Sequence, residues 1–295
     1  MPQLSVLISV YNSEKYIEEC IKSVLAQSFK DFELIIVNDG STDSTLDILK
    51  NFNDSRIKIF SKTNSGLIDS LNFGISLCQC ELIARLDSDD VCIADRFEIQ
   101  LNNFGVNDVI VGSNAFLINE KSIIYGKTNF PITNVRILES LKRLDNCIIH
   151  PSVIFKKSIL LKAGGFCPEA IHAEDFDLWL RMAFYGEIKI LKQPLIYLRK
   201  HSGNISRLNT RVQLISSYRS LVKYSIKKNG NLKEINRDKF DLFSNSMSFN
   251  FLVYLVLKNE KLDSFNLLHL PVKIFVRILI KLIKFILSFK LNYLL

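Results

Sequence analysis

The sequence predicts an α/β fold in which a largely parallel sheet with helices on both faces continues into a mixed sheet, followed by a C-terminal helical tail. Up to Asp90, short apolar runs alternate with segments whose apolar residues recur at helical spacing, which is typical of βαβ units. After Asp90 the alternation stops, and short strand-like runs follow one another around turns. Beyond Arg207 every strong pattern is helical.

Four strands and three helices are expected before Asp90. Each expected strand is a short apolar run, and each expected helix repeats its apolar residues every three or four positions. Ser41, Thr42 and Asp43 supply capping side chains for the second helix, which runs through Phe52. The expected strands are 4–10, 33–37, 56–60 and 81–86, and the other two helices are 14–27 and 65–77.

The elements after Asp90 indicate a mixed sheet. The turn from Asn119 to Lys121 joins two strand-like runs, and Gly164 with Gly165 forms a second turn. The expected strands are 109–111, 115–118, 122–125, 152–155, 188–190 and 195–198, and the expected helices are 95–104, 134–142, 157–162 and 174–185. A boundary near Ser206 then separates a domain of residues 1–206 from a helical region of residues 207–295.

The composition leaves room for a large hydrophobic core. Of the 295 residues, 48% are hydrophobic and 23% are charged, which excludes a disordered chain, a collagen and a small disulfide scaffold. The six cysteines form no CxxC pair and no zinc-ligand spacing, so we expect reduced thiols in the core of a cytosolic protein. The opening segment lacks a basic region and a long apolar run, so we expect no secretory signal.

The basic residues are concentrated in the tail. Residues 1–200 carry 22 lysines and arginines against 25 aspartates and glutamates, whereas residues 201–295 carry 16 against 5. Within residues 265–295, one face of an expected helix carries Lys273, Arg277, Lys281 and Lys284, and no uncharged run reaches the roughly 18 residues of a membrane span. We expect an interfacial helix on an anionic membrane surface, with a core-packing or oligomer-forming helix as the alternative.

Polar side chains follow three of the expected parallel strands. Tyr11 and Asn12 follow the first strand, residues 38–43 follow the second, and residues 87–90 follow the fourth. Ligands of open parallel sheets bind at the carboxyl ends of the strands, so these groups are expected to meet at one edge. No GxGxxG or GxxxxGK[ST] motif follows these strands, which argues against a dinucleotide fold of the usual kind and against a P-loop nucleotidase.

Asp87, Asp89 and Asp90 place three carboxylates within four residues. Such close like charges repel unless a cation lies among them, and oxygen ligands favour Mg²⁺ or Mn²⁺. The alternative is a solvated acidic turn that caps the next helix. Asp39 also has two interpretations, as an acceptor for a nucleotide base or as part of a turn in which Gly40 takes a positive φ, and the residues alone favour the turn.

A second acidic group begins a later helix. Glu174, Asp175 and Asp177 lie in the first turn, where acids ordinarily serve the helix dipole and capping. A carboxylate held beside a substrate pocket is also what a general base for a hydroxyl requires. His150 and His201 are two of four histidines, and an isolated histidine is more often a satisfied core or surface residue than a ligand.

The order of these segments is more specific than any one of them. The chain closely resembles the inverting family 2 glycosyltransferases of the GT-A fold, and more narrowly the bacterial enzymes that build surface polysaccharides. The resemblance spans about residues 3 to 206. It is carried by SVLISVYNSEKYIEECIKSVLAQSF, FELIIVNDGSTDST, NSGLIDSLNFGI, ELIARLDSDD, DRFEIQ, HPSVIFKKSILLKAGGF, AEDFDLWLRMAFYG and LRKHSGNIS.

The resemblance implies a role for each matching residue. It makes Asp175 the base that activates the acceptor, with Glu174 beside it, and Asp89 and His201 the metal ligands. The residues implied to bind the nucleotide-sugar donor are Tyr11, Asn12, Asp39, Arg85, Asp87 and Ser88. Ala94 stands where relatives commonly have proline, and Gln79-Cys80 where a glycine often precedes the fourth strand, but neither departure removes a reactive group.

The implied reaction is the inverting transfer of a sugar from a nucleotide diphosphate, expected to be UDP, to a hydroxyl of a glycan or lipid-linked glycan. Mg²⁺ or Mn²⁺ is the implied cofactor, and the cytoplasmic face of the inner membrane is the expected location. One alternative is a non-catalytic nucleotide-sugar or carbohydrate-binding protein, which the presence of both Asp89 and Asp175 argues against. A second alternative is a sugar nucleotidyltransferase. Such an enzyme would carry a Gly-rich loop with arginine or lysine right after the first strand, and that loop is absent here. Nucleic acid is not an expected partner, because the basic residues are interleaved with aliphatics and not with stacking aromatics.

Overall fold

The computed structural model describes residues 2–201 and the scattered residues 203, 209, 212, 213, 216, 217, 219–221, 223 and 224. The chain divides into two units, Met1–Ser220 and Leu221–Leu295. The expected boundary near Ser206 stays a prediction. The helix expected over residues 265–295 lies outside the described residues.

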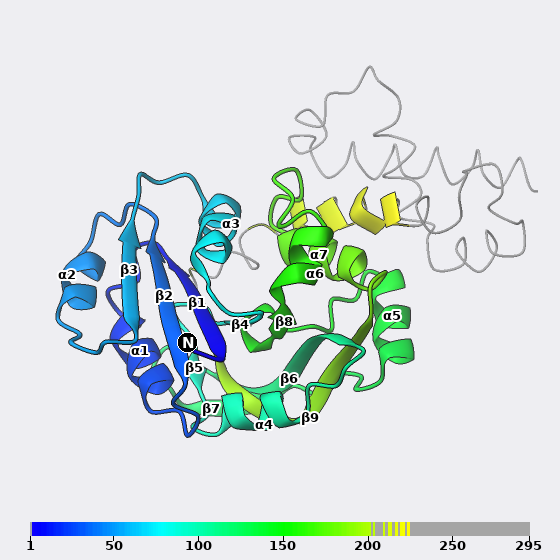
Figure 1. Cartoon of the computed structure of the whole chain (residues 1–295), viewed down its shortest axis with the longest axis horizontal. Coiled ribbons are helices and arrows are strands. Elements are labelled where there is room, and N and C mark those ends of the chain that lie inside the picture. Colours follow the sequence, from blue (N-terminus) through cyan, green and yellow to red (C-terminus); the bar gives the residue numbers. More distant parts are fainter. Residues whose placement is uncertain are drawn as a thin grey trace, which may run out of the picture. The chain divides into compact units, whose positions relative to one another are not determined.

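The first half of the sheet is parallel, as predicted. Its order is β3-β2-β1-β4, with Val10 opposite Asn38 and Leu7 opposite Arg85 (Figure 1). The strands are β1 (Leu4–Val10), β2 (Phe32–Asn38), β3 (Ile57–Ser61) and β4 (Leu82–Arg85), and the connecting helices are α1 (Ile17–Leu25), α2 (Thr45–Lys50) and α3 (Leu67–Leu77). All bounds lie within a few residues of the expected ones, except that α2 begins at Thr45, where the Asp43 carboxylate accepts a bond from the Thr45 amide.

Helices cover both faces of this parallel half. One face contributes Val6 and Ile8, which share a buried cluster with Cys20 and Ile21 of α1. The other face carries Leu7 and Val37, against which α3 packs at Gly74; a Cβ at that position would lie 2.3 Å from a Leu7 methyl. Because every residue of β1 and β2 is buried, the two strands read as continuous apolar runs in the sequence.

The second half of the sheet is mixed. It continues the order β4-β8-β6-β9-β5, with β7 paired to β6, and here the expected bounds need correction. The strands are β5 (Val91–Cys92), β6 (Asp108–Ile118), β7 (Ile124–Lys127), β8 (Ile154–Lys156) and β9 (Glu187–Arg199). The helices are α4 (Arg96–Asn102), α5 (Asn134–Lys142), α6 (Lys157–Lys162) and α7 (Glu174–Met182), with a short 3-10 helix at His150–Ser152.

Two strands were each expected as a pair of shorter strands. The pair 109–111 and 115–118 is one strand, β6, because the polar residues between them are buried and bonded: the Ser113 amide donates to Ser152 Oγ (3.1 Å) and the Asn114 amide group to Leu191 O (3.2 Å). The pair 188–190 and 195–198 is likewise one strand, β9, which pairs with β6 through register shifts. The strand expected over 122–125 starts later, at Ile124, because Ser122 takes a left-handed φ of 60°.

The cysteines are free thiols, of which five are buried and Cys167 is partly exposed. Among the described residues, no helix is long and apolar enough to span a bilayer.

Candidate active site

The parallel topology brings three strand ends to one edge of the sheet. Asn12, with a φ of 48°, ties the loop after β1 to the loop after β2. Its Oδ1 accepts from the Thr42 backbone amide (2.8 Å), and the Asn12 backbone amide donates to Ser41 Oγ (3.0 Å). Tyr11, at the end of β1, has half of its surface exposed. The loop after β4 lies beside this pair, since the Ser88 and Ser13 hydroxyls are 2.7 Å apart.

Asp39 is a buried carboxylate held by the segment that leads into α3. Its Oδ1 accepts from the Ser65 amide (3.0 Å) and Lys62 Nζ (2.6 Å), and its Oδ2 accepts from the Gly66 amide (2.9 Å). Although burial opposes ionisation, these bonds keep the pKa of Asp39 below its usual value. The turn interpretation therefore describes the local structure well. The Ser70 side chain also lowers the pKa of Asp39, and a carboxylate oxygen can accept from more than one donor.

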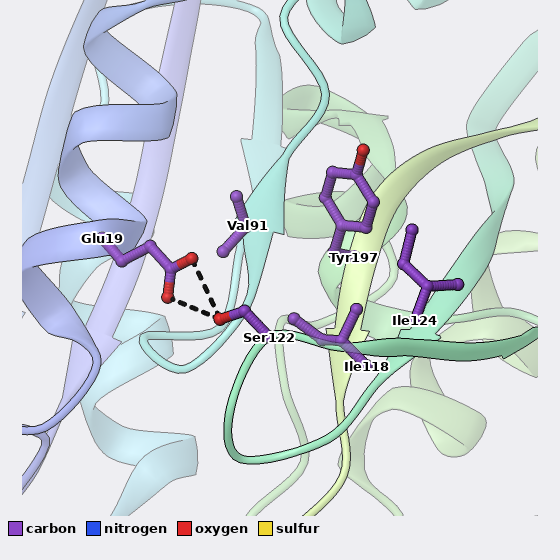
Figure 2. A pocket seen from close by; sticks show the side chains of 6 residues that line it. All are labelled: Glu19, Val91, Ile118, Ser122, Ile124 and Tyr197. Carbon is purple, nitrogen blue, oxygen red and sulfur yellow. Dashed lines mark hydrogen bonds between the residues drawn. The ribbon is translucent and has the colours of Figure 1, made fainter.

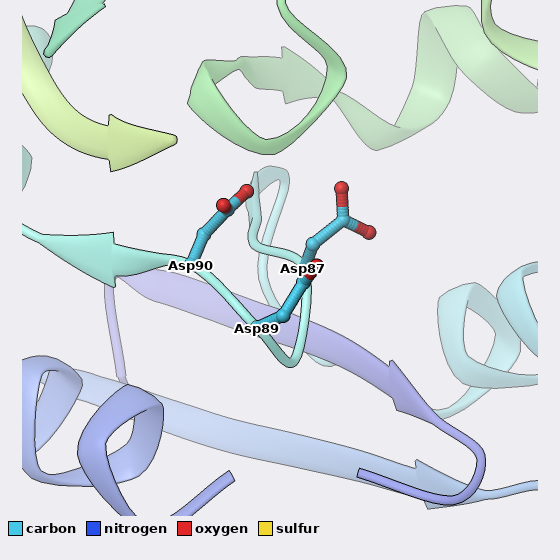
Figure 3. A group of neighbouring side chains, drawn as sticks. All are labelled: Asp87, Asp89 and Asp90. Carbon is cyan, nitrogen blue, oxygen red and sulfur yellow. The ribbon is translucent and has the colours of Figure 1, made fainter. Parts of the chain in front are cut away.

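Asp87, Asp89 and Asp90 converge in the loop after β4 (Figure 3), which we call the acidic loop, residues 87–90. One carboxylate oxygen from each lies within 4.8 Å of the others. Burial and the charge of Asp89 raise the pKa of Asp90 well above its usual value, and burial raises the pKa of Asp87 against the opposing effect of Arg85. Asp90 Oδ2 is buried without a hydrogen-bond partner among the described residues. Three crowded oxygen donors of this kind fit a hard divalent cation.

Arg85 and His201 border the acidic loop. The fully buried Arg85 guanidinium forms an ion pair with Asp87, while its Nε and Nη1 have no hydrogen-bond partner within the described part of the chain. His201 Nε2 lies 2.9 Å from Asp89 Oδ2, which places this histidine beside the acidic loop, and its role as a metal ligand stays a prediction. Asp90, which the carboxylate spacing included but the resemblance did not name as a ligand, joins Asp87 and Asp89 in the cluster.

The acids at the start of α7 belong to the same region. Asp175 accepts from the Phe176 amide at Oδ1 (2.6 Å) and from the Asn146 side chain at Oδ2 (2.9 Å). Burial, with the charge of Asp175, raises the pKa of Glu174 to about 7. Burial also raises the pKa of Asp175, and the charge of Asp87 acts in the same direction on both residues. The α7 acids are therefore electrostatically coupled to the acidic loop.

His150 is a core residue, as expected for an isolated histidine, but its Nε2 has no hydrogen-bond partner in the described structure. Its ring lies 5.6 Å from that of Phe166 and 5.7 Å from that of Trp179. Burial lowers the pKa of His150 well below its usual value, so the imidazole is neutral.

Polar side chains at three strand ends, an acidic loop after β4 and a second acid pair at the start of α7 are the features that the resemblance to nucleotide-sugar transferases of the GT-A fold requires. The chain belongs to glycosyl transferase family 2, whose family model matches residues 5–163. It is therefore a glycosyltransferase, and the resemblance drawn from its motifs is confirmed.

The relatives of this chain include an O-antigen glycosyltransferase and a hyaluronan synthase. The O-antigen biosynthesis glycosyltransferase WbnJ of Escherichia coli is 36% identical over 186 residues, which cover 62% of this chain and 72% of WbnJ. The hyaluronan synthase of Pasteurella multocida is 28% identical over 257 residues, covering 85% of this chain and 26% of the synthase.

Two solved structures share the fold at low sequence identity. TarS 1–349 of S. aureus in complex with UDP-GlcNAc has a TM-score of 0.61 at 20% identity, covering 85% of this chain and 81% of that chain. The mannosyltransferase PcManGT of Pyrobaculum calidifontis in complex with GDP-Man and Mn²⁺ has a TM-score of 0.57 at 16% identity, covering 75% and 64%. Both likenesses confirm the predicted fold class.

Proposed function

We propose that this glycosyltransferase moves a sugar from a UDP-sugar, with inversion, to a hydroxyl of a glycan or lipid-linked glycan in cell-surface polysaccharide biosynthesis. The observation that carries the proposal is the cluster of Asp87, Asp89 and Asp90 at the carboxyl end of β4, with Glu174 and Asp175 of α7 near enough for the charge of Asp87 to act on both. This arrangement places a site for a charged leaving group next to a site for a base. The O-antigen assignment of WbnJ and the UDP-GlcNAc complex of TarS support the acceptor class and the donor.

On the donor side, Asp39 accepts a hydrogen bond from the uracil through Oδ2, and Tyr11 with Asn12 forms the adjoining wall. Arg85 contributes two buried donors, Nε and Nη1, that lack acceptors among the described residues, and a buried unpaired donor favours an anionic ligand strongly. We assign these donors to the ribose and diphosphate, with Asp87 and Ser88 beside them.

The acidic loop holds a divalent cation, Mn²⁺ or Mg²⁺, through Asp89 with Asp87 and Asp90, and His201 assists at Asp89. When bound, the cation supplies charge neutralisation for the leaving nucleoside diphosphate. The raised pKa values of Asp87 and Asp90 support this role, because a cation among the three carboxylates relieves their repulsion.

On the acceptor side, Asp175 takes the proton from the attacking hydroxyl. The Phe176 amide and Asn146 fix both of its oxygens, which orients the carboxylate before the acceptor arrives. Glu174 has a pKa of about 7, so a large fraction of it is protonated near neutral pH. In that form it places no negative charge beside Asp175. Attack from the face opposite the leaving group inverts the anomeric centre in one displacement.

We also propose that the chain works at the cytoplasmic face of the inner membrane. The lysines and arginine expected on one helix face within residues 265–295 would bind it to the anionic surface. This location rests on the sequence pattern alone, since that segment lies outside the described residues.

A panel of nucleotide sugars, each with Mn²⁺, tests the proposal by thermal shift, followed by release of nucleoside diphosphate. We expect a UDP-sugar to raise the unfolding temperature of the wild-type chain in the presence of Mn²⁺, with much less effect on Asp89→Ala. Stabilisation by GDP- or dTDP-sugars instead would overturn the uridine assignment. A metal-independent shift that Asp89→Ala retains would overturn the metal site.

A further inference from the structure

We propose that Arg199 is a positioning residue that fixes the acidic loop in its cation-binding geometry, and that Glu19 and Ser122 in turn fix Arg199. The inference rests on the proposed function in one respect, that the acidic loop binds a divalent cation. It assigns a role to a residue that is not part of the acid cluster.

Arg199 donates two hydrogen bonds to the acidic loop. It is the last residue of β9, and its side chain is 1% exposed. Its Nε donates to the Asp89 carbonyl at 2.7 Å, and its backbone amide donates to Asp90 Oδ1 at 2.8 Å. The second bond leaves Asp90 Oδ2 as the oxygen without a protein partner in the described structure. Arg199 therefore sets the backbone at one acid and the carboxylate orientation at the next.

The far side of the guanidinium is held equally firmly. Nη1 donates to Ser122 Oγ (2.9 Å) and to the Asn119 carbonyl (3.2 Å), and Nη2 forms an ion pair with Glu19 at 2.6 Å. The guanidinium carbon also lies 4.6 Å from the centre of the Tyr16 ring. These partners come from α1 with its N-cap residue and from the turn between β6 and β7, so Arg199 joins two other parts of the fold to the acidic loop.

Figure 2 shows how the two side-chain partners are themselves ordered. Ser122 lies beside Glu19 and donates to both of its carboxylate oxygens, at 3.2 and 3.3 Å. Both residues line a pocket of about 200 Å³ whose other walls are apolar. A hydroxyl and a carboxylate that hold each other in this way present a fixed surface to the guanidinium.

The chemistry requires arginine in particular. A planar guanidinium can serve the Asp89 carbonyl through Nε while its two terminal nitrogens bond Ser122 and Glu19, whereas a lysine ammonium is a single point that cannot span these positions. Arg199 Nε bonds the backbone carbonyl of Asp89 and not its carboxylate. This bond therefore fixes the loop and does not use a carboxylate oxygen of Asp89. This is how outer-shell groups support metal ligands, and their loss typically weakens metal binding by 10- to 100-fold.

The test compares Arg199→Lys with a matched control, Arg56→Lys, in the full-length chain. Arg56 also pairs with a carboxylate, Asp54, and lies over an aromatic ring, Phe32, but it immediately precedes β3. Mn²⁺ binding is measured with Mn²⁺ alone, from the free-ion EPR signal, and the metal-free unfolding midpoint is recorded for each variant. We expect Arg199→Lys to weaken Mn²⁺ binding about tenfold or more, and Arg56→Lys to leave it unchanged.

Two further variants keep the inference testable if Arg199→Lys does not fold. Ser122→Ala and Glu19→Gln each remove one partner of the guanidinium, and we expect each to weaken Mn²⁺ binding about two- to fivefold. Turnover of Arg199→Lys should also recover towards the wild-type value at saturating Mn²⁺, which a general loss of structure would not allow. Unchanged Mn²⁺ affinity in folded Arg199→Lys, or in both partner variants, would overturn this inference alone. A wild-type chain that binds no Mn²⁺ would overturn the metal site itself.

Discussion

At the scale of single residues, the two acids that begin α7 are neighbours with different surroundings. Each oxygen of the Asp175 carboxylate accepts a hydrogen bond, which favours its ionised form. Burial instead raises the pKa of Glu174 to about 7, which favours its protonated form near neutral pH. We expect Asp175→Asn to lower turnover by about 10² or more with little change in donor binding, because the base is lost and the shape is kept. Steady-state kinetics and UDP titration measure both quantities. Normal turnover in Asp175→Asn together with a comparable loss in Glu174→Gln would exchange the two roles.

Asn146 tests the environment of the base without removing it. Its side-chain amide donates to Asp175 Oδ2 at 2.9 Å and so favours the ionised carboxylate. Without this donor the pKa of Asp175, already raised by burial, rises further. We expect the acidic limb of the pH–rate profile of Asn146→Ala to move to higher pH, with turnover at high pH largely retained. An unshifted limb, or a uniform loss at all pH values, would contradict this role.

Glu174 links the site to the stability of the protein. Burial raises its pKa from 4.5 to about 7, so between these values the folded state holds a proton that the unfolded chain has released. The free energy of unfolding therefore falls as the pH rises through this window. Glutamine does not ionise, so Glu174→Gln does not show this fall in the free energy of unfolding. The free energy of unfolding of the variant minus that of the wild type should therefore rise by up to about 3 kcal/mol from pH 5 to pH 8. Urea unfolding at both pH values measures the change, with the exposed Glu187→Gln as control.

At the scale of elements, the parallel half of the sheet was predictable and the mixed half was less so. β1 and β2 are buried on both faces, so their apolar runs mark them directly, and the polar residues after them fall at the carboxyl edge that topology dictates. β6 contains Ser113 and Asn114, which break the apolar pattern because their bonding partners lie on other elements, Ser152 in the 3-10 helix and Leu191 in β9. Asn146 and Arg199 escaped prediction for the same reason. Arg199 and Asp89 are 110 positions apart, and no local pattern encodes their contact.

The turn that carries Asp39 offers a test at this scale. Gly40 has a φ of 69°, and a Cβ there would lie 2.8 Å from the backbone nitrogen of Asn64, in the segment that bonds Asp39. We expect Gly40→Ala to destabilise the fold by about 1–3 kcal/mol and to weaken UDP binding, because the backbone segment must shift.

Gly66→Ala is the matched control for this turn. Gly66 also has a positive φ, 93°, but has open space where a Cβ would be placed. The control therefore carries the backbone strain without the collision. Urea unfolding and UDP titration of both variants separate the two effects, and equal losses in both would show that the close approach at Gly40 is unimportant.

At the scale of the whole molecule, charge separates along the sequence. The family 2 domain is nearly balanced in charge, while residues 201–295 carry 16 cations against 5 anions. A catalytic domain that uses a soluble nucleotide sugar needs no such region, but a lipid-linked acceptor is confined to a membrane surface. A basic amphipathic segment would keep the two reactants together, since each cation near an anionic surface contributes about 1 kcal/mol.

The last prediction therefore concerns the cations that the sequence spacing would place on one face of an expected helix over residues 265–295. We expect the full-length chain with Lys273, Arg277, Lys281 and Lys284 changed to serine to lose at least about 100-fold in binding to phosphatidylglycerol vesicles, because four favourable charges are removed together. Flotation measures the binding, with phosphatidylcholine vesicles for comparison. The matched control changes four exposed lysines of the described domain, Lys22, Lys50, Lys121 and Lys142, which alters the net charge equally. Equal loss in both variants would reduce the effect to net charge, and unchanged flotation with altered size-exclusion behaviour would favour an oligomer-forming helix.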